Sequence, residues 1–372
     1  MRKRTDTGGE FPRKTFCVCV FGFDEREEGG RIWAIRTGLV ENDVTVKRCQ
    51  TLINGFFAKY RELFRKWRDI EGRVDAIYVI FMGYYLMPLA WWLARCRGIP
   101  VVLDALVSQY DTEVVDRKRI SRFSPRAWFL WAVDFISCFI ADAVVVDTYE
   151  NKKFFIEKFL VNDRKIIVVP VGCRSDLFKP LPRSGSPEGG FVVEFHGGFS
   201  PLQGVEYIID AAEILQKGNE NVRFEIVGGG QLYAAIREKA RELGLSNVEF
   251  FDRKPIEELP RSIARGDVCL GIFGTTPKAL RVIPNKVYEC LSCGKPVITE
   301  RSPAALETLR DREEVLMTEP GNGPDLAKKI MELKRDAALR KRLGERAREV
   351  SVTEFSPRAV AKPLADWFAS HT

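Results

Sequence analysis

A lysine and a glutamate three residues apart stand out in the segment IPNKVYECLSCGKPVIT, residues 283–299. Pro284 suits the first turn of a helix, where its missing N–H is not needed. Gly294 suits the left-handed residue just past a helix end. The segment therefore predicts a helix from Pro284 to Ser292, followed by a buried strand.

Lys286 and Glu289 share one face of this predicted helix, beside the free N–H groups of its first turn. Helix N-termini and ammonium groups bind anions, and a carboxylate accepts hydrogen bonds from the two hydroxyls of a ribose. Together these groups suit a nucleotide-sugar, which carries a diphosphate and a ribose. An ordinary ion pair on a solvent-exposed helix is the alternative interpretation.

The first half of the chain alternates short apolar runs with helical patterns. Thr15–Phe23 is an apolar run of strand length, and Gly29 and Gly30 lie in the loop that leads into an amphipathic helix. These glycines would let a ligand approach the backbone at the helix N-terminus, although a plain turn explains them as well. Further strands are expected at Val44–Arg48, Ala76–Phe81, Pro100–Leu103, Ala143–Asp147 and Ile166–Val169. This alternation predicts a doubly wound α/β domain, with a parallel sheet between two layers of helices.

The second half repeats the strand and glycine pattern. His196 ends a predicted strand and is followed by Gly197 and Gly198, while Gly228 follows the strand in FEIVGGG. Backbone N–H groups at such glycine turns are suited to binding a diphosphate. We read His196 as a structural histidine.

A linker separates the two halves. Residues 180–190 are rich in proline, glycine and serine, which is typical of a linker. We expect an N-terminal domain over residues 1–182, completed by a terminal helix within 355–372, and a C-terminal domain over residues 190–354.

The helix segment resembles the donor-site signature of glycosyltransferase family 4, the retaining GT-B glycosyltransferases. The matching residues are Glu289, Ser292, Gly294, Pro296 and Val297. The segments PVGCRSDLFKP at 170–180 and FEIVGGG at 224–230 also resemble family patterns. The resemblance implies two Rossmann-like domains that face each other across a cleft.

The resemblance also implies roles in donor binding. Glu289 corresponds to the glutamate that binds the ribose of the donor, whereas Arg281 replaces the family's usual first glutamate. Phe199 and Gln203 replace two cations of the family's glycine loop. Lys286 is therefore the expected partner of the diphosphate, with help from Arg281. Arg253 and Lys254 lie in the stretch that meets the nucleobase in the family.

The implied reaction moves a sugar from a nucleotide-sugar to an acceptor hydroxyl with retention at the anomeric carbon. The acceptor is expected on the N-terminal domain, where Gly29 and Gly30 lie. Asp104 ends the fourth predicted strand and is a candidate catalytic residue beside Lys286. The chain has only two histidines, so a histidine-based metal site is poorly supported and we expect no cofactor.

Aromatic and basic residues alternate in FFAKYRELFRKWRDI, residues 56–70. The ordinary interpretation is a helix that covers the sheet with its apolar face. The alternative is an interfacial helix on an anionic membrane, which would suit a lipid-linked acceptor rather than a free glycan. The aromatic segments Tyr84–Leu93 and Arg126–Ile140 are expected to be buried helices.

Composition excludes several classes of protein. The net charge of +7 is mild, and no zinc-finger spacing or basic-aromatic tract supports nucleic-acid binding. The nine cysteines do not provide the two CxxC pairs of a zinc site, and they indicate reduced, buried thiols. The basic N-terminus lacks an apolar segment behind it, so we expect a cytoplasmic protein, peripheral at most on the inner face of the cell membrane.

Two rival functions fit the same architecture. A nucleotide-sugar epimerase would share the fold, but the scarcity of histidines argues against its acid-base chemistry. A degenerate GT-B scaffold protein would explain the missing glutamate and glycine-loop cations. Release of free sugar from a donor would separate transfer from scaffolding.

Overall fold

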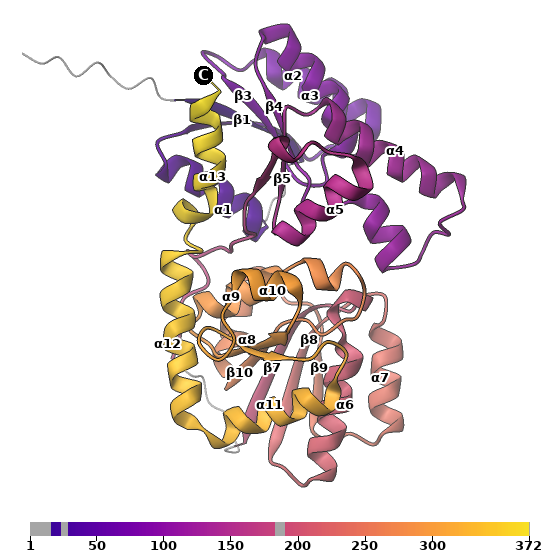
Figure 1. The fold of residues 1–372 in the computed structure, drawn as a ribbon, viewed down its shortest axis with the longest axis vertical. Helices are drawn as coiled ribbons and strands as arrows, with labels where there is room; N and C mark the ends of the chain where they lie inside the picture. The colour runs from indigo at the N-terminus through magenta and orange to yellow at the C-terminus, as the bar shows by residue number, and fades with distance from the viewer. Residues whose placement is uncertain (1–15, 24–28, 183–189, 372) are drawn as a thin grey trace, which may run out of the picture.

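The computed structural model describes residues 16–23, 29–182 and 190–371 (Figure 1). Two six-stranded sheets are stacked along the long axis, with strand orders β2-β1-β3-β4-β5-β6 and β12-β11-β10-β7-β8-β9. Every ladder in both sheets is parallel. The predicted GT-B architecture is confirmed. The expected basic leader and most of the expected linker lie outside the described residues.

The N-terminal sheet is built from continuous apolar runs because helices cover both of its faces. Its strands are β1 (Cys17–Phe23), β2 (Thr45–Thr51), β3 (Ala76–Val79), β4 (Val101–Asp104), β5 (Ala143–Val146) and β6 (Ile166–Val168). The helices are α1 (Gly30–Glu41), α2 (Phe56–Arg68), α3 (Met87–Arg97), α4 (Pro125–Ile140) and α5 (Tyr149–Phe159), with a π-helical turn η2 at Asp111–Asp116.

The C-terminal sheet follows the same plan. Its strands are β7 (Phe191–Gly198), β8 (Val222–Gly229), β9 (Val248–Phe251), β10 (Val268–Leu270), β11 (Val297–Glu300) and β12 (Leu316–Thr318). Its helices are α6 (Val205–Lys217), α7 (Tyr233–Glu242), α8 (Leu259–Arg265), α9 (Asn285–Ser292), α10 (Pro303–Thr308), α11 (Gly323–Arg335) and α12 (Ala337–Thr353). Helix α9 is the predicted one, with Pro284 at its N-cap and Gly294 in the left-handed region, φ +68°, after its end.

Part of the predicted core is exposed. Helix α4 was expected to be buried, but the structure leaves Trp128, Phe129 and Phe139 more than half exposed. In Tyr84–Leu93, Pro88, Trp91 and Trp92 are also exposed. These helices carry aromatic residues all round, so their sequences do not show which face meets the sheet.

The cysteines follow the prediction with one exception. All nine are free thiols, and Cys96 is the exposed one. Among the described residues, the structure has no helix long and apolar enough to cross a bilayer.

The last helix, α13 (Pro357–Ser370), returns to the N-terminal domain and packs along α1 (Figure 1). The two helices approach closely because α1 carries a glycine at the crossing. A Cβ atom built on Gly38 would lie 1.8 Å from the carbonyl oxygen of Pro357 and 2.7 Å from the Cβ of Ala361. Phe368 of α13 stacks on Phe16 with ring centroids 5.3 Å apart.

Replacing Gly38 should therefore loosen α13. We expect Gly38→Ala to destabilise the protein by about 1–3 kcal/mol, because an added methyl group must push the backbone of α13 away. Gly218→Ala is the matched control, since a Cβ there meets its nearest atom at an ordinary 3.4 Å. Chemical unfolding followed by circular dichroism measures both. Equal stabilities for the two variants would contradict the close packing.

Candidate active site

A cavity of about 520 Å³ lies between the two domains. It opens at the carboxyl ends of β5, β7 and β8, which is where ligands bind in doubly wound sheets. The N-terminal domain contributes Leu106, Val107, Thr112, Asp116, Arg117, Asp147 and Val171. The opposite wall carries six of the predicted residues, namely Gly197, Gly228, Arg253, Lys254, Lys286 and Glu289.

Lys286 projects from the first turn of α9 and is almost fully buried at the cavity wall. Its ammonium lies 3.6 Å from the centre of the Phe195 ring and donates a hydrogen bond to Oε1 of Gln203. Burial lowers the pKa of Lys286 to about 7, although the nearby carboxylate of Glu194 opposes this shift. A Cβ on Gly197, where φ is +154°, would lie 2.6 Å from the Lys286 Nζ. The glycine therefore makes room for the ammonium.

Glu289 lies one turn further along α9 and is also buried. Its Oε2 is 3.0 Å from Nε2 of His196, and Nδ1 of His196 is 2.9 Å from Oε1 of Glu194. Burial alone would lower the pKa of His196, but the two carboxylates more than offset it and raise the pKa to about 10. His196 lines the cavity. The sequence signal was the pair Glu194 and His196, since residues i and i+2 of a strand share one face.

The glycine turns and the nucleobase candidates lie along the same wall. A Cβ on Gly228 would lie 1.9 Å from the carbonyl oxygen of Gly197, so the two turns are in direct contact. Gly198 does not line the cavity. Arg253 donates to the carbonyl of Gly229 over 3.2 Å, and Lys254 donates to Oγ of Ser262 over 2.9 Å.

Asp104 is not a residue of the cavity. Its two oxygens accept from Nε and Nη2 of Arg31 at 2.8 and 2.9 Å, and Oδ2 also accepts from the Tyr78 hydroxyl at 2.7 Å. All three side chains are buried. The structure therefore places Asp104 away from Lys286 and the cavity, where its carboxylate ties α1 to β4.

Arg281 was also misplaced by the sequence analysis. Its guanidinium forms an ion pair with Asp111 over 2.8 Å and lies over the ring of Phe154. The cavity wall does not include it. Two neighbouring contacts also reach η2, from Lys278 to Thr112 over 2.6 Å and from Thr276 to Asp116 over 2.8 Å. Arg281 therefore joins the two domains instead of reaching a diphosphate.

The acceptor-side glycines lie beside the cavity without lining it. Gly29 is the N-cap of α1 and Gly30 is its first residue. A Cβ on Gly30 would lie 3.5 Å from the side chain of Asn285, which does line the cavity. The loop before them, residues 24–28, lies outside the described residues.

Asp147 is a cavity residue that the sequence analysis missed. It follows β5, is buried, and accepts a hydrogen bond from Nδ2 of Asn151 over 2.8 Å. Burial raises the pKa of Asp147 to about 6. Its position at the carboxyl end of a parallel strand was the available signal.

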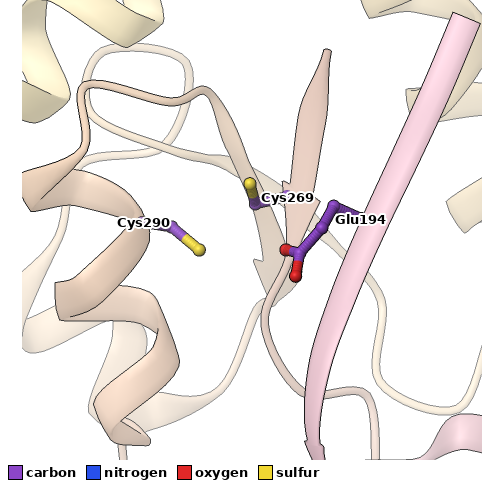
Figure 2. Close-up of side chains that lie close together, drawn as sticks. All are labelled: Glu194, Cys269 and Cys290. Atoms are coloured by element: carbon purple, nitrogen blue, oxygen red, sulfur yellow. The ribbon is translucent and has the colours of Figure 1, made fainter. Parts of the chain in front are cut away.

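A cluster with metal-ligating atoms lies on the strands and helix behind the cavity. One carboxylate oxygen of Glu194 and the sulfur atoms of Cys269 and Cys290 lie within 4.8 Å of one another, with Cys290 reaching in from α9 (Figure 2). These three ligands are one fewer than a structural zinc site uses, and zinc requires thiolates. Burial raises the pKa of the Cys290 thiol, and Glu194 is already paired with His196. The cluster therefore fits a packed floor under α9 better than a metal site.

Comparisons with known proteins agree with this geometry. Residues 181–350 match the family model described as "Glycosyl transferases group 1". The match covers a little under half of the chain, within its C-terminal half. An uncharacterized glycosyltransferase of Methanocaldococcus jannaschii is 28% identical over 224 residues, which cover 57% of this chain and 61% of the relative. The probable glycosyltransferase WbjE of Pseudomonas aeruginosa is 28% identical over 172 residues, or 42% of this chain and 40% of the relative. The chain thus matches less than two thirds of either relative's length.

Solved structures share the fold over nearly the whole chain. The HepE protein of Anabaena in complex with UDP-glucose has a TM-score of 0.70 at 18% identity, with 95% of this chain and 99% of that chain covered. Sucrose-phosphate synthase from Thermosynechococcus elongatus has a TM-score of 0.72 at 17% identity, with 95% and 98% covered. At this identity the likeness shows the GT-B fold alone.

The buried Lys286 gives a test of stability against pH. Its pKa is lower in the folded protein than in the unfolded chain, so its charge destabilises the fold below about pH 7 and this penalty fades as the pH rises towards about 10. We expect Lys286→Met to raise the unfolding midpoint near pH 6, by an amount that shrinks near pH 9. Lys328→Met, which replaces an exposed lysine of α11, should change neither value. A Lys286→Met variant that melts below wild type near pH 6 would contradict the buried, strained charge.

Proposed function

We propose that this chain is a retaining glycosyltransferase of family 4 that uses the interdomain cavity to move a sugar from a nucleotide-sugar to an acceptor hydroxyl. The observation that carries the proposal is the wall of the cavity formed by α9. There a cation, free helix N–H groups and a carboxylate lie within one turn of one another. No second feature of the described residues combines all three groups around a cavity of this size.

Donor binding follows from the chemistry of that wall. The diphosphate would lie against the N-terminus of α9 and the Gly197 turn, where Lys286 supplies positive charge. Glu289 would accept hydrogen bonds from the ribose hydroxyls, and the nucleobase would extend towards Arg253 and Lys254. Structures of HepE contain UDP-glucose or UDP, which supports a nucleotide-sugar for this chain.

The transfer itself needs little chemistry from side chains. The bond from the anomeric carbon to the diphosphate breaks, and the acceptor oxygen bonds to the same face of that carbon. The acceptor's proton passes to a diphosphate oxygen, so that no protein nucleophile and no cofactor is required. Lys286 and the helix N-terminus would stabilise the charge that grows on the leaving diphosphate. Asp147 and Asp116, on the opposite wall, would contact the acceptor.

A donor panel tests the function. In a thermal-shift screen with UDP-, GDP- and ADP-glucose, the true donor class at about 100 times its dissociation constant should stabilise the protein by ~2.7 kcal/mol. Glu289→Gln should weaken that donor by about tenfold or more, because a hydrogen bond to a charged group is worth ~1.5–3 kcal/mol. Glu249→Gln, at an exposed position of β9, is the control. Slow release of sugar from the donor supports transfer, whereas binding without release across the panel favours the scaffold interpretation.

We also propose that the acceptor is lipid-linked and that the protein binds the inner face of the cell membrane peripherally. The support is an aromatic face on α2, η1 (Tyr84–Leu86) and α4, where Phe56, Phe57, Trp128 and Phe129 are exposed and Tyr60 and Tyr85 are half-buried. Consecutive rings contact one another: Phe56 lies 5.5 Å from Phe57 and 4.5 Å from Tyr60, and Tyr85 stacks on Phe129. The Tyr60 hydroxyl donates to the Tyr85 carbonyl, which joins the two halves of the face.

Basic residues accompany this aromatic face. Arg61, Arg65 and Arg68 are exposed on α2, and Arg122 and Arg126 are exposed at the start of α4. Rings that enter the headgroup region beside such cations are typical of interfacial membrane binding. The other half of α2 behaves differently, because Leu63 and Trp67 are buried against the sheet. The sheet-covering interpretation thus describes one part of the surface of α2, and the membrane proposal concerns the other part.

Sedimentation with anionic liposomes tests the membrane proposal. Replacing Arg61, Arg65 and Arg68 by glutamate should abolish sedimentation at low salt, since each basic residue contributes about 1 kcal/mol near an anionic leaflet. The melting temperature should hardly change, because these side chains are exposed. The control reverses three exposed charges of the C-terminal domain, at Lys328, Arg335 and Lys341. If wild type stays in the supernatant at low salt, a soluble acceptor is the better hypothesis.

A further inference from the structure

Glu194, His196 and Glu289 form a continuous hydrogen-bonded row at the base of the cavity. The imidazole of His196 lies between the two carboxylates, at 2.9 Å from Glu194 and 3.0 Å from Glu289. All three side chains are at least nine-tenths buried. The row joins β7 to α9. His196 and Glu289 are 93 residues apart in the sequence.

The geometry fixes the charge of the imidazole. A neutral imidazole has one N–H group and can donate to one acceptor, whereas an imidazolium donates through both nitrogens. Each ring nitrogen of His196 faces a carboxylate oxygen, and an ionised carboxylate only accepts. The arrangement is therefore satisfied in full when His196 is positively charged.

The neighbouring charges support this state. From α9, Lys286 adds a second positive charge beside Glu194 and Glu289 below about pH 7, where the four buried side chains sum to zero. The thiols of Cys269 and Cys290 also lie close to the Glu194 carboxylate. The other titratable groups that line the cavity are Asp116, Asp147, Arg117, Arg253, Lys254 and Lys278. With a neutral His196 the base of the cavity would carry an unbalanced negative charge where an anionic diphosphate must bind.

We propose that His196 is a positioning residue: a buried imidazolium, held by Glu194, that fixes the Glu289 carboxylate so that its remaining oxygen meets the ribose of the donor. This role rests on the proposed function, because it assumes that Glu289 binds a ribose. It assigns Glu194 and His196 to donor recognition, although Glu194 itself does not line the cavity.

The imidazolium can be observed without any donor. The chain has two histidines, His196 and His371, so His371→Gln leaves a single imidazole signal in ¹⁵N NMR spectra. We expect both ring nitrogens of His196 to remain protonated well above pH 7. Adding Glu194→Gln should lower the titration midpoint by about one pH unit or more, because an opposite charge is lost. A wild-type His196 that is neutral at pH 7 would overturn the proposal whatever the protein binds.

Donor binding separates positioning from a merely structural role. Calorimetry with UDP, GDP and ADP, each against its 2′-deoxy form, measures how well the ribose is recognised. We expect wild type to prefer the ribonucleotide at every pH from about 6 to 8.5. In Glu194→Gln this preference should persist below the titration midpoint found by NMR and fall by about tenfold one pH unit above that midpoint, where only about one tenth of the imidazole stays protonated.

A matched control and two outcomes complete the test. Glu225 pairs in register with Glu194 on the next strand, so Glu225→Gln removes a similar charge from the same sheet and should leave the preference unchanged. If the midpoint shifts in Glu194→Gln but the preference does not, His196 is structural and the positioning role is overturned. If wild type binds none of the three nucleotides, the proposed function and this role both fall, while the NMR titration still reports the imidazolium.

Discussion

The position of α9 is the constraint on which the candidate site depends. Its C-terminal end is fixed from both domains: the Ser292 hydroxyl donates to the carbonyl of Phe178, and Arg348 of α12 donates to the carbonyl of Ser292, each over 2.7 Å. Tyr288 packs edge to face on Phe355, with ring centroids 5.0 Å apart. With that end held, the first turn of α9 points into the cleft. Lys286 and Glu289 then reach the cavity from one rigid element rather than from two mobile loops.

Burial makes the same charges both costly and useful. Moving an ion out of water costs several kcal/mol, and the cost is recovered only when partners are well placed. Glu194, His196 and Glu289 meet that condition, because the imidazole lies between the two carboxylates, and the same carboxylates favour the charged form of Lys286. A site prepared in this way needs little reorganisation when a charged ligand arrives, which is the main requirement for electrostatic stabilisation of a transition state. The cost that remains is visible in the lowered pKa of the buried Lys286.

Local patterns predicted what local physics decides. The apolar runs predicted the strands. Pro284 and Gly294, at the two ends of α9, predicted the helix and the face that carries Lys286 and Glu289. Partnerships between distant residues could not be read in this way. Asp104 ends a strand as a catalytic residue would, but its partner Arg31 lies 73 residues earlier in the chain. The same holds for Arg281, whose partner Asp111 lies 170 residues away. The resemblance to family 4 predicted the role of α9, yet it was silent on His196, whose neighbours depend on how the two elements pack. The exposed aromatic face of α4 was missed because rings on all sides of a helix leave its orientation undetermined.

The return of α13 to the first domain has a mechanical consequence. The chain passes between the domains once near Pro180 and again between α12 and α13, and both passages run close to the end of α9. A Cβ on Gly294 would lie 3.7 Å from Pro180 and 3.6 Å from Arg348 of α12. Two adjacent connections form a hinge. They favour rotation of one domain relative to the other about the line between them, and they restrict sliding and twisting. The contacts between η2 and residues 276–281 are interdomain contacts that such a rotation would have to break. A rotation of this kind would displace α9 less than parts of the domain farther from the two connections, because the end of α9 lies beside them.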